Sequence, residues 1–147
     1  MRRTLSALVH DIARLRRKLL DAALRPVGIT RAQRWMLIML SQYGEQGVSQ
    51  VELAQAMQVG AVSLGEKLGL LETQGYVVRV RSASDRRRNK VRLSDAGYRA
   101  LHDSTALTQA FNRQAMMGLT DQELAMVERA LAVIHANLTR MNMAASE

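Results

Sequence analysis

The chain has 147 residues, of which 48% are hydrophobic, a formal net charge of +8 and no cysteine. This length predicts one domain around one core, and the lack of cysteine excludes disulfides and thiolate metal sites. The longest apolar run, residues 36–40, is too short to cross a bilayer, and the arginine-rich start lacks the apolar segment of a secretory signal. We therefore expect a soluble, cytoplasmic protein with no membrane partner.

The first predicted element is an amphipathic helix. Its apolar residues recur three and four positions apart, the spacing of a helix that buries a narrow stripe against a partner helix. These residues are Leu5, Leu8, Ile12, Leu15 and Leu19. The helix should end before Pro26 and Gly28.

Two capping boxes predict the starts of the second and third helices. Thr30 is followed three positions later by Gln33, a spacing with which each side chain can bond the backbone of the other. The polar segment 44–47, which contains two glycines, should stop the second helix. Ser49 and Glu52 repeat the capping spacing and should open the third helix.

A tight turn, 58–60, should join the third helix to a fourth. The buried faces of these two helices are predicted to carry Leu53, Ala54, Met57, Ala61, Leu64, Leu68 and Leu71. Gly75 should end the fourth helix, because glycine adopts the left-handed conformation without steric cost. Gly65 and Gly69 lie one turn apart in this helix, and they either permit a close backbone approach or mark a pliable element.

Residues 76–93 are predicted to form a basic β-hairpin. Tyr76, Val78 and Val80 should point to one side of the first strand and Arg79 and Arg81 to the other. The return strand covers 91–93. The hairpin holds seven basic residues and one acidic residue, Asp85, so it carries six of the chain's eight net positive charges. Such a cluster favours binding to a polyanion through counterion release, although a merely solvated loop is the alternative.

Two further helices are predicted after the hairpin. Ser94 can cap a fifth helix that runs towards Met117, and Thr120 with Glu123 forms a third capping box. The last helix again has apolar residues three and four positions apart: Leu124, Val127, Leu131, Ile134, Leu138 and Met141. The stripes at the two ends of the chain favour a symmetric homodimer, and the alternative is that both helices cover the core of a monomer.

No pattern in the sequence indicates catalysis. His10, His102 and His135 are far apart, and no nucleophile elbow, phosphate-binding loop or metal-ligand cluster is present. We therefore predict that the protein is not an enzyme and needs no cofactor and no metal.

The predicted elements add up to a mainly α fold with a small antiparallel β-hairpin. Two short helices joined by a tight turn and followed directly by a basic hairpin are typical of a winged helix-turn-helix. The chain resembles the MarR family of bacterial transcription regulators, and its SlyA-like branch in particular. The resemblance rests on TRAQRWMLIML, SQVELAQAMQV, LGLLETQGYVVR and, above all, the wing sequence SDRRRNKVRLSDAG.

The resemblance implies a single MarR-like domain over residues 1–147. Residues 28–101 would form the winged helix-turn-helix lobe, and residues 1–27 and 102–147 would form dimerisation helices. It also implies a homodimer on a pseudo-palindromic site in double-stranded DNA. The sequence therefore predicts a sequence-specific transcription regulator, a ligand-responsive repressor, with a non-specific architectural nucleic-acid-binding protein as the alternative.

The fourth helix is predicted to enter the major groove by the face opposite its leucines. On that face Val62 can contact a thymine methyl group and Ser63 either kind of base edge, while Lys67 on the flank reaches a phosphate. Leu70 and Thr73 lie on the same face. Glu66 occupies a place where similar proteins commonly have arginine, and it either accepts from cytosine N4 or pairs with a neighbouring cation.

The wing supplies the other predicted DNA contacts. Arg87 falls on the family's arginine position and is the candidate for insertion into the minor groove. Asp85 would orient an arginine, and Arg86, Arg88 and Lys90 would contact phosphates. At the start of the third helix, Ser49 and Gln50 are placed for contacts to the DNA backbone, although Ser49 can instead serve only as a helix cap.

A regulator of this type implies an effector, and similar proteins often bind small aromatic or anionic molecules in a crevice beside the DNA-binding lobe. The candidate ligand-binding residues here are His10, Arg14, Trp35, Met36 and Met39. Their charged groups could hold a carboxylate and their soft side chains a ring. The alternative is that the tryptophan and the methionines only pack in the core.

Overall fold

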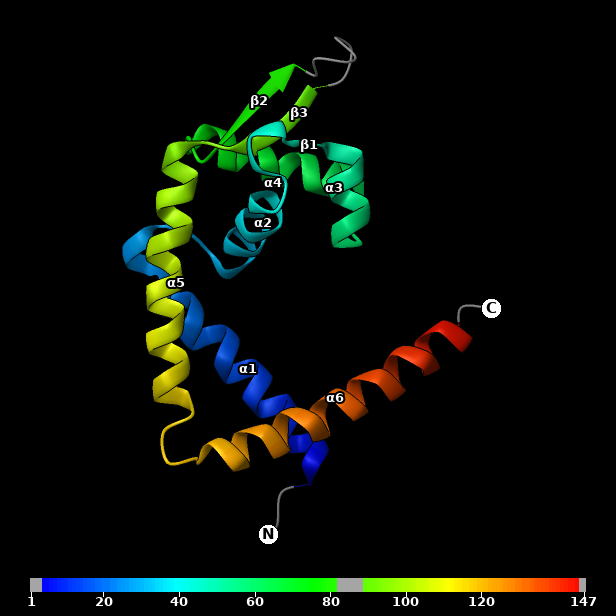
Figure 1. The fold of residues 1–147 in the computed structure, drawn as a ribbon. Helices are drawn as coiled ribbons and strands as arrows, with labels where there is room; N and C mark the ends of the chain where they lie inside the picture. Colours follow the sequence, from blue (N-terminus) through cyan, green and yellow to red (C-terminus); the bar gives the residue numbers. More distant parts are fainter. Residues whose placement is uncertain (1–3, 82–88, 146–147) are drawn as a thin grey trace. The chain divides into compact units, whose positions relative to one another are not determined.

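The computed structural model describes residues 4–81 and 89–145. Helices dominate, and three short strands form one sheet (Figure 1). The helices are α1 (Leu5–Leu24), α2 (Arg31–Ser41), α3 (Gln50–Met57), α4 (Ala61–Thr73), α5 (Asp95–Ala115) and α6 (Asp121–Ala144), with short 3-10 turns at Arg25–Val27 and Gly44–Gln46. The strands are β1 (Val48–Ser49), β2 (Val77–Arg81) and β3 (Asn89–Leu93). The chain divides into two compact units between Phe111 and Asn112.

The fold class is confirmed, with one strand more than the sequence predicted. The strands are antiparallel in the order β1-β3-β2, so β1 pairs with the outer edge of the hairpin, Val48 opposite Val91. A strand of two residues is too short to show an alternating pattern. Gly47 makes this pairing possible: its φ is +61°, and a Cβ at this position would lie 2.8 Å from the carbonyl oxygen of Val91.

The two faces of the hairpin alternate as predicted, and the structure shows which of them lies towards the core. Val77 is 2% exposed and lies opposite Leu93, so these two residues and Val91 lie on the face towards the core. Arg79 lies opposite Val91 on that same face. The alternation of valine and arginine is confirmed, but Val78 and Val80 lie on the outer face of the sheet and are only half-buried. Val77 is the buried residue of β2 on the face towards the core, and the sequence pattern did not assign it to either face.

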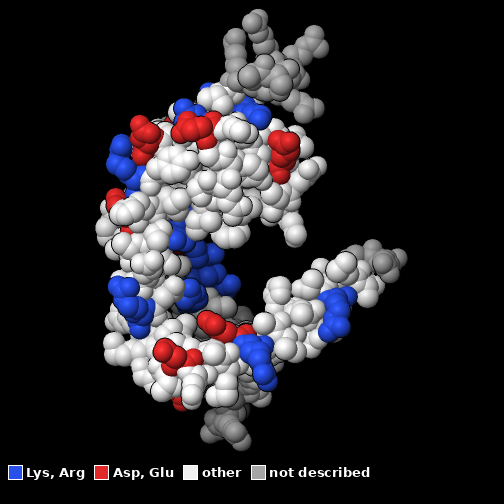
Figure 2. Space-filling view, in the orientation of Figure 1, with Lys and Arg blue, Asp and Glu red and all other residues white. Residues whose placement is uncertain are grey.

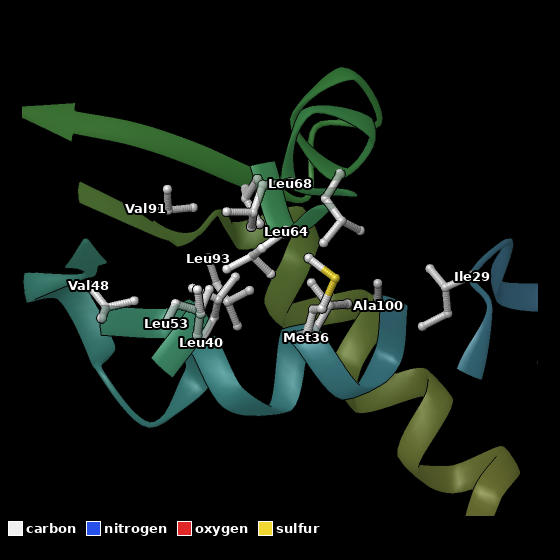
Figure 3. Packing of buried hydrophobic residues seen from close by; sticks show 14 residues of the cluster. Ile29, Met36, Leu40, Val48, Leu53, Leu64, Leu68, Val91, Leu93 and Ala100 are labelled. Carbon is white, nitrogen blue, oxygen red and sulfur yellow. The ribbon is translucent and has the colours of Figure 1, made fainter. Parts of the chain in front are cut away.

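The core lies between α2, α3, α4 and the sheet (Figure 3). Leu37, Leu40, Leu53, Leu64 and Leu71 are fully buried, and each such side chain contributes about 1.5–3 kcal/mol to stability. Leu53, Ala54, Leu64, Leu68 and Leu71 are buried as predicted, whereas Met57 is only partly buried and Ala61, at the first position of α4, is exposed.

All three predicted capping boxes are formed, at Thr30, Ser49 and Thr120. The end of α4 is also as predicted. Gly75 has a φ of +76°, its N–H donates to the carbonyl of Glu72, and the N–H of Tyr76 donates to the carbonyl of Leu71. These two bonds make a Schellman motif, which satisfies carbonyl groups that the helix leaves free.

The apolar stripes of α1 and α6 remain exposed in the single chain. Between 40% and 67% of the surface is accessible at Leu5, Leu8, Val9, Ile12, Leu15 and Leu19 of α1 and at Met126, Val127, Leu131, Val133, Leu138, Met141 and Met143 of α6. Within residues 112–145 no residue is buried. The second unit therefore has no core of its own.

None of the helices in the described residues is both long enough and apolar enough to span a membrane.

Candidate nucleic-acid interface

The helix-turn-helix places α4 with one face in the core and the other in solvent. The turn after α3 is closed by Gln58, whose φ is 54°, and by the N–H of Val59, which donates to the carbonyl of Ala54. Val62 is 80% exposed and Leu70 is 62% exposed. Ser63, Glu66, Lys67 and Thr73 are exposed as well. The solvent face of α4 is therefore the predicted one.

Glu66 makes no ion pair or hydrogen bond within residues 4–81 and 89–145. It is exposed on the same side of α4 as Val62 and Ser63. Of its two predicted roles, pairing with a neighbouring cation is not formed among the described residues, and acceptance from a cytosine amino group stays a prediction.

Gln50 and Gly65 meet between α3 and α4. The Nε2 atom of Gln50 donates to the carbonyl oxygen of Ala61 over 2.9 Å. A Cβ at Gly65 would lie 2.7 Å from that Nε2 atom, whereas a Cβ at Gly69 would meet no atom within 4 Å. Of the two explanations for these glycines, close approach therefore applies to Gly65, although what approaches is a side-chain amide.

The sheet brings Ser49 next to Lys90, because these residues are opposite each other in β1 and β3. Lys90 is partly exposed there. The hydroxyl of Ser49 caps α3: it accepts from the N–H of Glu52 at 3.2 Å and donates to the Glu52 carboxylate at 2.6 Å. The capping role of Ser49 is therefore present, and its contact with DNA stays a prediction.

Among the basic hairpin residues that the structure describes, Arg79 and Arg92 are paired within the lobe. Arg79 bonds Glu72 of α4 at 3.0 Å, and Arg92 bonds Glu45 at 3.1 Å. Figure 2 accordingly shows acidic and basic side chains interspersed at the end of the lobe that carries the strands. The formal charge of the hairpin thus overstates the charge available to a polyanion. Asp85, Arg86, Arg87 and Arg88, the predicted tip contacts, lie outside the described residues.

A compact joint links α4, the wing and α5. The hydroxyl of Ser94 donates to the carbonyl of Gly75 at 2.6 Å and accepts from the N–H of Gly97 at 3.0 Å. The N–H of Ser94 donates to the carbonyl of Tyr76. Gly97 is buried, and a Cβ there would overlap that same carbonyl oxygen. These contacts explain why the wing sequence contains Ser94 and Gly97. From the sequence, Ser94 was expected only to cap a helix, and Gly97 was only part of the wing motif.

A surface pocket of about 350 Å³ lies between α2, the α3–α4 turn and α4. It is lined by Arg31, Ala32, Arg34, Trp35, Met36, Met57, Val59, Leu64 and Lys67. It therefore brings two predicted ligand-binding residues, Trp35 and Met36, together with three cations. The spacing of residues 31, 34 and 35 on one helix face is the signal that could have predicted this cluster.

The other candidate ligand-binding residues do not line this pocket. His10 is exposed on α1, and Arg14 bonds Asp11 of the same helix at 3.3 Å. Met39 packs against the core, and Met36 is only 2% exposed, so core packing accounts for both methionines. Trp35 differs from them, because it is 53% exposed.

Arg34 is the unusual member of the pocket. Its Nη2 atom lies 3.4 Å from the Thr105 hydroxyl of α5, and its Nε atom is buried without a hydrogen-bond partner among the described residues. Burial lowers the pKa of its guanidinium from the ordinary value.

Comparison with known proteins supports the reading of this lobe. A family model described as the MarR family matches residues 27–88. The structure is similar to a cysteine-to-serine variant of MarR from E. coli in complex with operator DNA, with 27% identity, a TM-score of 0.75, and coverage of 88% of this chain and 92% of that one.

Two other solved structures share the fold. The MepR–DNA complex from S. aureus has 22% identity, a TM-score of 0.75, and coverage of 92% of this chain and 96% of that one. The regulator SlyA has 20% identity, a TM-score of 0.74, and coverage of 94% and 96%. The SlyA-like branch therefore stays a prediction. The helix-turn-helix and wing region is therefore similar to the MarR family, and the chain shares the fold of solved MarR structures, one of them in complex with operator DNA.

Proposed function

We propose that the protein is a ligand-responsive repressor that binds a pseudo-palindromic DNA site as a homodimer. The observation that carries the proposal is the exposed face of α4, which presents Val62 at 80% and Leu70 at 62% exposure. An α-helix about 10 Å wide fits the major groove of B-form DNA. Val62 and Ser63 then read base edges, Glu66 accepts from cytosine N4, and Lys67 contacts a phosphate.

The wing completes the interface. Arg87 enters an adjacent narrow minor groove, and Asp85 holds an arginine in place. Arg86, Arg88 and Lys90 contact phosphates, each adding about 0.9 to the slope of log affinity against log salt concentration. Ser49 lies opposite Lys90 in the sheet, so the start of α3 adds to the same backbone contact.

A homodimer follows from the exposed stripes of α1 and α6. A soluble chain rarely leaves so many large apolar residues exposed in rows, and two copies can cover them by symmetric helix packing. Two copies also present two α4 helices, which fit half-sites one turn of DNA apart, about 34 Å.

The effector would be a small aromatic anion in the pocket behind α4. Arg31, Arg34 and Lys67 supply positive charge, and Trp35 supplies an exposed ring. Because Leu64 and Lys67 belong to α4 itself, a ligand that binds one position of α4 better than another shifts the DNA-binding equilibrium. His10, Arg14 and Met39 belong to this site only if it extends beyond the pocket.

The test of DNA recognition is to select DNA fragments with the purified protein and to compare its affinity for the selected site and for random duplex. A sequence-specific regulator should prefer the selected site by about 10³-fold or more. A ratio near one would identify a non-specific architectural protein instead. Binding as two subunits per site, measured by sedimentation, tests the homodimer.

The effector is tested with benzoate as the probe. Benzoate should release the wild-type protein and the control variant Arg25→Ala from the selected site, because Arg25 is exposed outside the pocket. It should not release Arg31→Ala. Equal release of all three proteins would exclude this pocket as the effector site.

A further inference from the structure

The sequence of α4, the helix proposed to read the DNA, gives this helix little stability of its own. Helices α2, α3 and α6 begin with complete capping boxes, whereas the N-cap of α4 is Gly60, which has no side chain to cap the free N–H groups. Two glycines follow in α4, and each costs about 1 kcal/mol of helix stability relative to alanine. The start of α4 is therefore less stabilised by its own sequence than the starts of α2, α3 and α6.

Gln50 binds the first turn of α4 from α3, at a carbonyl oxygen and not at the free N–H groups. Its side chain crosses to α4 and donates from Nε2 to the carbonyl oxygen of Ala61, the first residue of α4, over 2.9 Å. In a helix this oxygen also accepts from the residue four positions on, which is Gly65. The amide of Gln50 thus joins the backbone of the first turn, directly before Val62 and Ser63.

Gly65 makes room for this contact. A Cβ there would lie 2.7 Å from Nε2 and 3.4 Å from Cδ of Gln50, whereas a Cβ at Gly69, one turn later, would meet open space. Of the two glycines in α4, Gly65 is the one that lies against the amide of Gln50. The pairing of Gln50 and Gly65 is thus a specific packing arrangement between α3 and α4.

We propose that Gln50 is a positioning residue that fixes the first turn of α4 in the orientation that reads DNA. Gly65 leaves the space that the Gln50 amide occupies. The proposal rests on the proposed function, because it assigns Val62 and Ser63 to base contacts. It replaces the earlier expectation that Gln50 acts by contacting the DNA backbone. If the Gln50 contact is lost, the first turn of α4 can move, and the base contacts that it carries become weaker.

The test compares the wild type with Gln50→Ala, Gly65→Ala and the double variant. Gln55→Ala on the exposed side of α3 and Gly69→Ala on α4 are matched controls. For each protein, affinities for the selected site and for random duplex are measured over a range of salt concentrations, together with the melting temperature. Gln50→Glu, which keeps the side-chain length but removes the donor, serves as a second probe of the same bond.

Gln50→Ala, Gln50→Glu and Gly65→Ala should each weaken binding to the selected site by about tenfold, the loss typical of one disturbed base contact. Affinity for random duplex should change less than about twofold, and the salt slope should stay unchanged, since no phosphate contact is removed. In the Gln50→Ala background, Gly65→Ala should cause no further loss of affinity and should raise the melting temperature as Gly69→Ala does. This non-additivity is the signature of a shared contact.

Other results would overturn the proposal. If the losses at Gln50 and Gly65 add, the two residues act separately. If Gln50→Ala lowers the salt slope by about one unit, Gln50 contacts a phosphate directly. If the wild type discriminates between sites and Gln50→Ala discriminates equally well, this inference alone is wrong. If the wild type does not discriminate at all, the proposed function is overturned and this inference with it.

Discussion

At the scale of single residues, the lobe depends on places where a side chain is absent. Gly47 lets β1 approach β3, Gly65 accommodates the amide of Gln50, and Gly97 lets α5 start against the carbonyl of Tyr76. In each case the atom nearest to the missing Cβ belongs to another element of the lobe. These glycines therefore determine how closely the elements of the lobe can pack.

Gly97→Ala should destabilise the protein by about 1–3 kcal/mol, because the added methyl group overlaps backbone that cannot move without breaking the Ser94 joint. Gly69→Ala is the control, and it should raise stability because its Cβ meets open space in a helix. Thermal unfolding of both variants measures the difference. A Gly97→Ala protein that melts with the wild type would contradict this description of the joint.

At the scale of elements, we make predictions for the start of α6 and for the wing. The pKa of Glu123 is lowered first by the hydrogen bond from the backbone N–H of Thr120 and then by the bond from the Thr120 hydroxyl. The folded chain therefore keeps Glu123 ionised at a lower pH than the unfolded chain does. The resulting stabilisation of α6 is complete above the ordinary pKa of about 4.3 and is lost as the pH falls through the lowered value.

An NMR titration of the Glu123 carboxyl group should give a pKa below that ordinary value, and Thr120→Ala should return it towards normal. Glu123→Gln should keep the capping box, as Gln33 does in α2, and should remove this contribution to the pH dependence of melting. A wild-type titration at the ordinary value would show that the bonds from Thr120 do not persist in solution.

The wing prediction concerns Arg87, which lies outside the described residues. Arg87→Ala should weaken binding to the selected site far more than Arg99→Ala, because Arg99 is exposed on α5 and has no predicted DNA contact. Titration of both variants with the same duplex measures this. Equal losses would remove the minor-groove assignment.

At the scale of the whole molecule, the second unit provides little stability by itself. No residue within 112–145 is buried, and α6 exposes a row of leucine, valine and methionine side chains. A partner subunit would bury this surface, and at roughly 25 cal/mol per Å² its burial is a large favourable term. Folding of α6 and association of two chains are therefore expected to be coupled.

Leu131→Asp should weaken or abolish the dimer, since it places a charge in the apolar row of α6, and should reduce affinity for the selected site with it. Arg129→Asp introduces the same residue two positions earlier, at an exposed polar position, and serves as the control. Sedimentation velocity over a concentration range measures both. A Leu131→Asp protein that sediments as the wild type does would place the dimer interface elsewhere.

The sequence by itself determined the helices, their capped starts and the exposed face of α4, because these depend on periodic patterns and on contacts between residues three or four positions apart. Only the tertiary structure decided the third strand, the buried place of Val77, the ion pairs that occupy Arg79 and Arg92, and the cation cluster around Trp35. It also showed that Gly65, and not Gly69, leaves space for a side chain of another helix. The physical reason is that each of these features depends on a partner distant in sequence, such as Gln50 for Gly65 or Glu45 for Arg92, and local propensity carries no information about such a partner.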